Sequence, residues 1–384
     1  MSYESFSTTQ RVLFGEGSIA SIVDELSRLN ARNVLIVTDP GLVGTGIVDR
    51  LEDILKNGDV KSARFDKVEA DPRYEIADEA LTLLHSSRAE AVIGIGGGSS
   101  LDIAKIVSVL ASNDQPVTEM FGIDLIKKPG LPLILIPTTA GTGSEVTPIV
   151  ILSDEHEKLK KGVVSPYLFP SCALLDPELT LGLPPNVTAA SGMDALIHAL
   201  EAYTSKNATD MSDILAREAI VLIYNSIRTA YANGTNIKAR SGMLRGSLLA
   251  GMAFANAGVT AVHAFAYPIG AEYHIPHGVA NTIMLVPVMR FNMIGNLERF
   301  SELPTFFGLS TEGLSPRQAA QLGIDALVEL AEDLNVPQHL SEYGVKEAAV
   351  PSLAESVMKV TRLLANNPRK LLVTDAERIY RAAL

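Results

Sequence analysis

Carboxylate and imidazole side chains gather in the second half of the chain. Asp194 and His198 are four residues apart in SGMDALIHALEAY, so on a helix they project from one face. Glu201 continues this polar stripe and the rest of the segment is apolar, which predicts a buried helix. A buried carboxylate beside a histidine must be compensated, and a divalent cation favours the ionised carboxylate and the neutral imidazole together. The segment therefore predicts a metal-binding helix.

Further histidines follow in AVHAFAYPIGAEYHIPHG, where His263 and His277 are fourteen residues apart and His274 lies near the second. A Pro-Ile-Gly break between them can turn the chain so that the imidazoles face one point. For any single histidine, a core or surface role is commoner than ligation. One carboxylate with three imidazoles is nevertheless a ligand set that suits Fe²⁺ or Zn²⁺ with room for a substrate oxygen. The remaining histidines lie far away in the sequence and are expected to be structural or exposed: His85, His156 and His339.

Three glycine-containing segments could approach a phosphate. GGGSSLDIAK at 96–105 is the most informative, because a buried strand runs into three glycines and then into a helix start whose free N–H groups bind phosphate. The alternative there is a tight turn with a serine cap. GEGSIA at 15–20 fits the dinucleotide pattern G-x-G-x-x-A, but also an ordinary turn before a helix. PTTAGTGSEVTP at 137–148 presents hydroxyls after another buried strand, as either a ligand-binding loop or a plain polar loop.

Asp39 ends the strand predicted at 34–39. A carboxylate there can accept hydrogen bonds from both ribose hydroxyls of an adenosine, whereas a 2′-phosphate would meet a like charge. This favours NAD over NADP. The alternative is an Asx turn with Pro40 and Gly41.

Two kinds of element must hold these residues. From residue 34 to about 180, short apolar runs such as VLIVTD and LPLILIP alternate with amphipathic segments, which predicts a doubly wound parallel α/β sheet. After residue 182 the strand pattern stops and long helical patterns follow. We therefore expect an NAD-binding α/β domain at 1–182 and an all-helical metal-binding domain at 183–384, with ligands between them.

Composition narrows the function classes. The 384 residues contain 32 Lys and Arg against 44 Asp and Glu, a net charge of −12, which argues against nucleic acid or a membrane surface as partner. No apolar run approaches the roughly 18 residues of a membrane span, and MSYESFSTTQ lacks a signal-peptide pattern, so we expect a cytoplasmic protein. Cys172 is the single cysteine, which excludes an intramolecular disulfide, and we expect it to be a small buried residue.

At these motifs the chain resembles the iron-containing, or group III, alcohol dehydrogenase family over nearly its whole length. The resemblance is carried by GGGSSLDIAK, PTTAGTGSE, GMDALIHALEAY and HA-x-A-x-P-x-G…PHGVAN, in the family's order. It implies a dehydroquinate synthase-like fold and a homodimer or larger assembly. It implies a metal, with Fe²⁺ favoured and Zn²⁺ the alternative, at Asp194, His198, His263 and His277. Together with the helix start, it implies NAD contacts at Asp39, Gly97, Gly98, Ser99, Asp102, Thr138, Thr139, Thr142 and Lys160.

The chain departs from the family pattern at two places. Tyr267 stands where many members have a second histidine that is thought to shuttle protons, and tyrosine there is similar to the branch that acts on 4-hydroxybutyrate. Tyr267 is therefore a candidate proton relay, or a packing residue. Asp71-Pro72 stands where many members have Asn-Pro near the adenosine. Phe254 is a candidate substrate-wall residue, with an apolar core role as the alternative, and His274 lies at a position that the family varies.

We therefore predict an NAD-dependent and metal-dependent alcohol dehydrogenase or aldehyde reductase. Its substrates would be small primary alcohols, diols or hydroxy acids, and it would act by hydride transfer to nicotinamide. One alternative is a 4-hydroxybutyrate-type hydroxy acid dehydrogenase. A second is a lyase like dehydroquinate synthase, which recycles its cofactor. A third is a catalytically silent nucleotide- or metal-binding protein.

Overall fold

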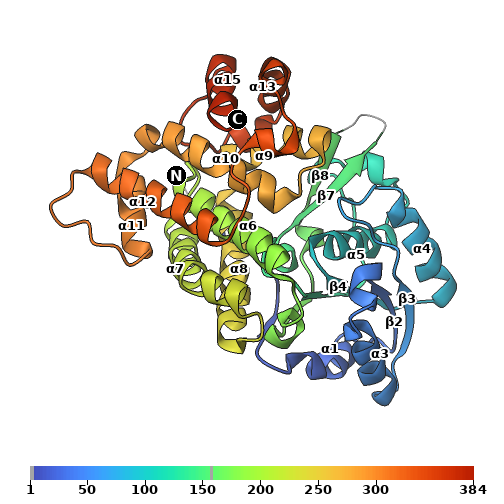
Figure 1. Cartoon of the computed structure of the whole chain (residues 1–384). Coiled ribbons are helices and arrows are strands. Elements are labelled where there is room, and N and C mark those ends of the chain that lie inside the picture. The colour runs from blue at the N-terminus through green and yellow to red at the C-terminus, as the bar shows by residue number, and fades with distance from the viewer. Residues whose placement is uncertain (1–3, 156–158) are drawn as a thin grey trace. The chain divides into compact units, whose positions relative to one another are not determined.

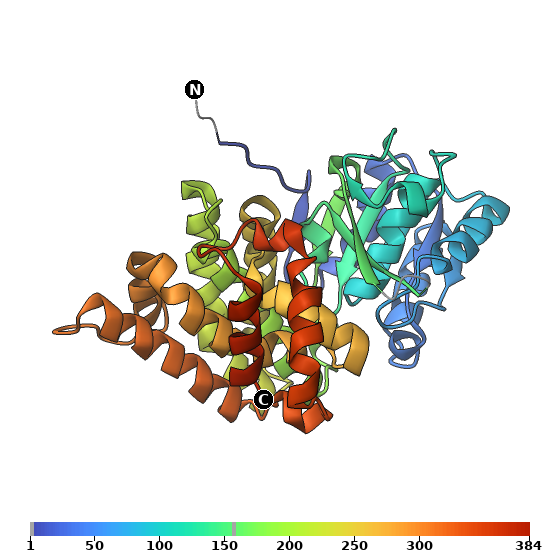
Figure 2. The same cartoon turned by 90° about the horizontal axis from the view of Figure 1, so that it is seen from above.

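A computed structural model describes residues 4–155 and 159–384 of the chain. The chain divides into an α/β unit, Thr8–Thr139 and Gly143–Gly182, and a helical unit, Leu183–Leu384 with Ala140–Thr142 and the described residues before Thr8 (Figures 1 and 2). The two short segments belong to the α/β domain in the sequence-based prediction. The segment before Thr8 groups with the helical unit because the Ser7 backbone exchanges hydrogen bonds of 2.7 and 3.0 Å with the Asn256 side-chain amide.

A parallel sheet with strand order β1-β9-β6-β4-β2-β3 forms the centre of the α/β unit. Its strands are β1 (Val12–Phe14), β2 (Asn33–Val37), β3 (Lys61–Phe65), β4 (Ala91–Gly96), β6 (Leu133–Pro137) and β9 (Cys172–Leu175). Strands β4 and β6 are buried along their whole length, which is why their sequences are apolar throughout. Cys172 is buried in β9, as predicted.

Helices cover this sheet, and a smaller sheet follows it. The helices are α1 (Ile22–Arg28), α2 (Pro40–Val43), α3 (Ile47–Asn57), α4 (Ile76–Ser87) and α5 (Gly98–Leu110). One core lies between the sheet and α4 with α5, and the other lies against α1 and α3. The smaller sheet has the order β5-β8-β7 and consists of β5 (Gly122–Ile123), β7 (Ile149–Asp154) and β8 (Leu159–Val164).

The strand order places three sequence motifs at one edge of the main sheet. Strand β4 pairs with β2 on one side and with β6 on the other, and both pairings are parallel. The segments that follow their carboxyl ends therefore meet at the same edge, the usual ligand-binding position of such sheets. These segments are Asp39 after β2, the glycine turn 96–98 after β4, and Thr138 after β6.

The helical unit is built around α6 (Pro185–Thr204), which packs against α7 (Asp210–Ala232), α8 (Ile237–Ala257) and α10 (His277–Asn292). From Gly192 to Thr204 every residue of α6 is buried, as its apolar sequence predicts. The other helices are α9 (Ala261–Tyr273), α11 (Leu297–Phe306), α12 (Pro316–Asp333), α13 (Val350–Met358), α14 (Thr361–Leu364) and α15 (Val373–Ala382).

No single helix among the described residues is long and apolar enough to cross a membrane. Helices α8 and α9, which are bent by 102° at their junction, together have the length and composition of a membrane span, and nothing else in the described residues supports one.

Candidate metal and cofactor sites

Helices α6, α9 and α10 bring four predicted ligands together. Asp194 Oδ1 on α6 lies 3.6 Å from His263 Nε2 on α9 and 3.8 Å from His277 Nε2 at the start of α10. One ligand atom from each of these three residues lies within 4.8 Å of the other two. The ring of His198, one turn after Asp194, stacks on the His263 ring with centroids 4.5 Å apart. Three of the four ligands that the resemblance implied therefore have ligand atoms close to one another, and the fourth, His198, lies beside them.

Glu201 orients His263 from the opposite side of its ring. Its Oε2 lies 2.5 Å from His263 Nδ1, while the Thr260 hydroxyl and the Val262 backbone N–H donate to its Oε1 at 2.5 and 2.7 Å. A carboxylate accepts, so His263 Nδ1 carries a proton and Nε2 is the atom turned toward Asp194. His263 Nε2 is buried and lacks a hydrogen-bond partner among the described residues. This geometry is typical of a histidine that binds a metal.

The protonation of the site is dominated by its own carboxylates and imidazoles. Burial opposes ionisation of Asp194 and Glu201, but the neighbouring histidines outweigh it and lower the pKa of both carboxyl groups. Burial lowers the pKa of His198 to about 4, so its ring is neutral at physiological pH. Burial also opposes protonation of His263, yet the neighbouring carboxylates of Asp194 and Glu201 raise its pKa to about 9. Two buried carboxylates among imidazoles are the donor set that a divalent cation neutralises.

Two further groups contact the ligands, and sequence reasoning did not assign either of them. The Asn281 side-chain amide donates to Asp194 Oδ1 at 2.7 Å, and it lies one helical turn after His277. Its polarity in the apolar helix α10 was an available signal. The Gly141 carbonyl lies 3.3 Å from His198 Nδ1. A carbonyl only accepts, so this contact places the proton on Nδ1 and leaves Nε2 as the ligand atom of His198.

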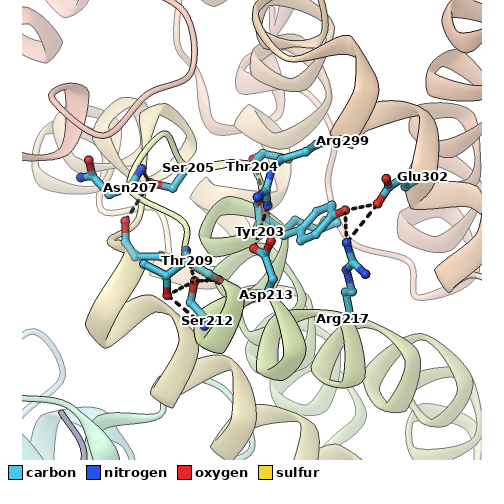
Figure 3. Close-up of polar contacts among 12 residues, drawn as sticks. Tyr203, Thr204, Ser205, Asn207, Thr209, Ser212, Asp213, Arg217, Arg299 and Glu302 are labelled. Atoms are coloured by element: carbon cyan, nitrogen blue, oxygen red, sulfur yellow. Dashed lines mark hydrogen bonds and ion pairs between the residues drawn. The ribbon is translucent and has the colours of Figure 1, made fainter. Parts of the chain in front are cut away.

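The carboxyl end of α6 is fixed by a cluster around Tyr203 (Figure 3). The Tyr203 hydroxyl contacts Glu302 and accepts from Arg217 Nη2 at 3.2 Å. Arg299 Nη1 donates to the Tyr203 carbonyl and to Asp213 Oδ1, both at 2.7 Å. Because Glu201 lies only two residues earlier, this cluster also holds the carboxylate that orients His263.

Both candidate substrate-side residues lie against ligand histidines. The Phe254 ring stacks on His198 with centroids 4.3 Å apart, and the Tyr267 ring centroid lies 6.2 Å from that of His277. His274 is exposed at the end of α9, in the left-handed region with φ 53°. His85 and His339 are exposed, and His156 lies outside the described residues.

The α/β unit brings Asp39 beside the glycine turn. Its Oδ1 accepts from the Leu42 backbone N–H at 3.0 Å, which caps α2, and its Oδ2 accepts from the Ser100 hydroxyl at 3.2 Å. The cap that we considered as an alternative is therefore present, together with a contact to the predicted phosphate loop. Gly97 caps α5, and Gly98 and Ser99 form the first turn, where all three are partly exposed.

The threonines after β6 start beside the same turn. The Thr138 backbone N–H donates to the Gly96 carbonyl at 3.0 Å. A Cβ on Gly97 would lie 3.8 Å from the Thr139 side chain. Thr138 is buried, whereas Thr139 and Thr142 are partly exposed. The structure therefore gathers Asp39, the glycine turn and Thr139 at one edge of the sheet.

Two other predicted cofactor residues are engaged elsewhere. Asp102 accepts from the Ser144 hydroxyl at 2.6 Å and from the Ile151 backbone N–H at 2.9 Å, so it faces the segment 144–151. Lys160 pairs with Asp71 at 2.6 Å, which joins one predicted NAD contact to the family departure at Asp71.

The GEGSIA segment is a structural turn. The backbone N–H groups of Gly17 and Ile19 donate to the two oxygens of Asp176 at 3.1 and 3.2 Å. These are the donors that a phosphate would need at a helix start. The dinucleotide pattern at 15–20 is thus accounted for by a side chain from much later in the chain.

Comparison with known proteins decides the family. Residues 9–177 match the family described as iron-containing alcohol dehydrogenase, and residues 188–384 match the C-terminal part of the Fe-containing alcohol dehydrogenase family. The chain belongs to the iron-containing alcohol dehydrogenase family. The predicted resemblance is therefore confirmed, and with it the assignment to the oxidoreductases of the alcohol dehydrogenase type.

Individual relatives of this iron-containing alcohol dehydrogenase align over nearly all of its length. It is 42% identical over 372 residues to long-chain-alcohol dehydrogenase 1 of Geobacillus thermodenitrificans, which covers 96% of this chain and 94% of that protein. The structure of 1,3-propanediol oxidoreductase superposes with a TM-score of 0.97 at 37% identity, covering 100% of both chains. That of sulfoacetaldehyde reductase from Bifidobacterium kashiwanohense with NAD⁺ has a TM-score of 0.89 at 28% identity, covering 100% of this chain and 99% of that one. These superpositions confirm the predicted fold class, an α/β unit followed by helices in the dehydroquinate synthase-like fold.

Proposed function

We propose that this protein is a metal-dependent, NAD(H)-dependent dehydrogenase that interconverts small primary alcohols or diols and their aldehydes. One observation carries the proposal: in a chain of this family, ligand atoms of Asp194, His263 and His277 lie within 4.8 Å of one another, His198 stacks on His263, and the buried His263 Nε2 has no hydrogen-bond partner among the described residues. A divalent ion, Fe²⁺ or alternatively Zn²⁺, fits this donor set. When bound, the ion supplies Lewis acidity toward a substrate oxygen and nicotinamide supplies the hydride acceptor.

The chain's own residues hold the reacting groups in place. Asp194 is kept ionised by its histidine neighbours, and Glu201 keeps the Nε2 lone pair of His263 available. The Gly141 carbonyl does the same for His198. Phe254 covers the His198 ring on one face and thereby keeps water from that ligand, and Tyr267 beside His277 presents a hydroxyl that could hold a proton near the substrate.

On the cofactor side we assign the adenosine ribose to Asp39 and the pyrophosphate to the start of α5. Gly97, Gly98 and Ser99 are partly exposed at this helix N-terminus, where the backbone N–H groups bind anions. Thr138, Thr139, Thr142 and Lys160 complete the proposed contacts. The sulfoacetaldehyde reductase relative, whose structure contains NAD⁺, supports NAD as the cofactor.

Substrate size, assembly and location belong to the same proposal. The relatives described above are named for 1,3-propanediol, for a long-chain alcohol and for sulfoacetaldehyde, which share a terminal carbon–oxygen group. We propose a homodimer or larger homo-oligomer in the cytoplasm, acting on such terminal groups.

The test is a substrate panel with metal-loaded protein. Purified protein is stripped with chelator, loaded with Fe²⁺ or Zn²⁺, and mixed with NAD⁺ and C2–C4 alcohols, 1,3-propanediol or 4-hydroxybutyrate. We expect absorbance at 340 nm to rise only in loaded samples, and an Asp194→Asn protein treated identically to stay flat. Absence of NADH across the panel with both metals would overturn the proposal.

The same experiment separates the dehydrogenase from a lyase like dehydroquinate synthase. A dehydrogenase releases one NADH for each alcohol oxidised, so NADH accumulates in proportion to aldehyde. A lyase that recycles its cofactor forms product without net NADH. Proportional NADH and aldehyde therefore support the proposal, and product without NADH supports the lyase.

A further inference from the structure

A buried lysine lies directly behind the glycine turn of the α/β unit. Lys105 belongs to α5, and its side chain is 0% exposed. Its ammonium contacts the Ser144 hydroxyl at 2.8 Å, the Ile149 carbonyl at 2.9 Å and the Thr147 hydroxyl at 3.2 Å. A lysine has three N–H donors, and these acceptors account for all of them. All three acceptors lie within six residues of one another, so the lysine is committed to a single segment of the chain.

Asp102, one turn earlier on α5, forms hydrogen bonds with the same segment. It accepts from the Ser144 hydroxyl and from the Ile151 backbone N–H, and its Oδ1 lies 3.7 Å from the Lys105 ammonium. The Ser144 hydroxyl thus links the lysine and the carboxylate. Helix α5 therefore holds the short helical turn Ser144–Val146 and the start of β7 by two charged side chains on one face.

A second buried carboxyl group, that of Glu145, interacts with the charge of Lys105. Glu145 is only 1% exposed, and its Oε1 has no hydrogen-bond partner among the described residues. Lys105 is the cation whose charge favours its ionised form. Burial nevertheless raises the pKa of Glu145 to about 7, so the lysine compensates a buried charge on Glu145 only once that carboxyl ionises.

The segment that Lys105 and Asp102 contact begins at Ser144, directly after the loop 138–143 that carries the proposed cofactor threonines. At its beginning, Thr138 is fixed to the end of β4 through the Gly96 carbonyl at 3.0 Å. At its other end, Gly143 turns the chain with φ 58°, and Ser144 follows on Lys105. The loop therefore has three attachments: Thr138 at the glycine turn, the Gly141 carbonyl beside His198 Nδ1, and Ser144 on Lys105.

We propose that Lys105 is a positioning residue for NAD(H): by fixing Ser144 and Thr147 it anchors the end of the loop 138–143, whose first residues, Thr138 and Thr139, lie beside the glycine turn at the start of α5. The proposal rests on the proposed function, because it assumes that this loop contacts NAD(H). Lys105 does not touch the cofactor in this role. Its effect reaches the cofactor through the loop threonines.

The test measures NADH binding directly, by the fluorescence of NADH added to the purified full-length protein, alongside the thermal midpoint. Lys105→Met removes all three contacts, and we expect NADH to bind roughly tenfold more weakly or worse, the equivalent of one charged hydrogen bond. Thr147→Val removes one acceptor at nearly constant shape and should weaken binding about twofold to fivefold. The KM for NAD⁺ should rise in step, with a smaller change in kcat.

Asn113→Ala is the matched control. Asn113 is buried just after the other end of α5. Its side-chain amide forms hydrogen bonds with the backbone groups of Val109 and Lys128, away from the loop. It should lower the thermal midpoint while NADH affinity stays within about twofold of the unchanged protein. If Lys105→Met fails to fold, Thr147→Val and Ser144→Ala decide the question.

The outcomes are distinguishable from those of the proposed function. An unchanged protein that binds no NADH overturns the proposed function and this inference with it. If the unchanged protein binds NADH and the Lys105, Ser144 and Thr147 variants bind it equally well, only the inference fails. It fails also if Asn113→Ala weakens NADH binding as much as they do at an equal loss of thermal midpoint.

Discussion

Two buried polar clusters in this chain solve the same electrostatic problem in different ways. In the α/β unit, Asp102 and Glu145 are buried near Lys105, whose ammonium is fully used within the described chain. In the helical unit, Asp194 and Glu201 are buried as well, but the ion-pair partners found for them among the described residues are histidines. The first cluster contains its own cation, although burial lowers the pKa of Lys105 to about 8, and the second contains nitrogen atoms that face a common point.

The difference distinguishes a structural charge cluster from a ligand site. A buried ion pair with a lysine is complete, and removing one partner leaves an uncompensated charge. Histidines neutralise a carboxylate only while protonated: burial lowers the pKa of His198 to about 4, so its ring adds no charge, whereas Asp194 and Glu201 raise the pKa of His263 to about 9, so one imidazolium lies between two carboxylates. A divalent cation can replace those protons and uses the same nitrogen atoms as ligands. The carboxylate excess of the helical unit is therefore best explained by a bound metal ion.

The largest effect is expected when the metal cluster loses its carboxylate. Asp194→Asn removes the only carboxylate among the predicted ligands, so metal affinity should fall by more than the roughly 10–100-fold that loss of an outer partner costs. Metal content after dialysis, measured by elemental analysis, and cobalt titration followed by visible absorbance check this. Asp375→Asn is the matched control, because Asp375 is also buried in the helical unit but pairs with Arg378 on α15. Equal metal content in both variants would show that Asp194 is not a metal ligand, and the distinction between the two clusters would fail.

The second-largest effect is expected on stability, when the cluster of Lys105, Asp102 and Glu145 loses its lysine. Lys105→Met leaves Asp102 and Glu145 without their cation, and we expect the free energy of unfolding to fall by about 3–5 kcal/mol. Lys160→Met is a suitable reference, because Lys160 pairs with an Asp71 side chain that is 54% exposed, and such pairs contribute about 1 kcal/mol or less. Urea denaturation of the two variants in one buffer gives the difference. Similar losses would mean that the burial of Lys105 has no energetic consequence.

A smaller effect is expected from the residue that orients a ligand. Glu201→Gln keeps the shape of the side chain but weakens its hold on His263 Nδ1, so we expect metal affinity to fall about 10–100-fold with the fold intact. Cobalt titration and circular dichroism separate the two properties. Glu178→Gln, at a half-exposed pair with Arg50 in the α/β unit, should leave cobalt affinity unchanged. A Glu201→Gln protein that binds cobalt normally would show that Glu201 only fills space.

The metal helix was predictable from sequence because local periodicity was sufficient. Asp194, His198 and Glu201 are the polar stripe of an otherwise apolar helix, and α6 is buried as that pattern requires. The predicted Pro-Ile-Gly break is wrong, because Pro268 lies inside α9, which continues to Tyr273. The convergence of His263 and His277 depends instead on the end of α9, where His274 adopts a positive φ. Spacing does not fix such a turn, so this part of the prediction depended on family resemblance.

Residues whose partners come from distant segments were harder to assign. Asp102 was expected at the cofactor because it lies in the first turns of α5, but its partners come from Ser144 and Ile151. The dinucleotide pattern near Gly17 was likewise ambiguous, since the acceptor that satisfies it is Asp176. Lys105 gave a signal, as the one cation in an apolar helix, but its acceptors could not be identified before β7 was placed.

The smallest expected effect is the pH dependence of the lysine cluster. Burial raises the pKa of Glu145 to about 7 from its usual 4.5, with Lys105 opposing the shift. Between these pH values the folded protein retains a proton that the unfolded chain has released, so this group's stabilising contribution is present below about pH 4.5 and is lost as pH rises through about 7. Glu145→Gln cannot ionise and should lack this loss.

Paired measurements of unfolding at pH 5 and pH 8 isolate that contribution. We expect the free energy of unfolding of Glu145→Gln relative to the unchanged protein to increase by on the order of 1 kcal/mol from the lower to the higher pH. The sign follows because the introduced glutamine amide mimics the protonated carboxyl, which is the form that the folded protein prefers at pH 5. The Glu145 charge also raises the pKa of Lys105, which burial lowers to about 8, so a third measurement at pH 7 separates the Glu145 contribution from that of Lys105. A difference that is constant with pH, or that decreases as pH rises, would show that Glu145 stays ionised in the fold, and the lysine cluster would then be a fixed ion pair with no proton of its own to lose.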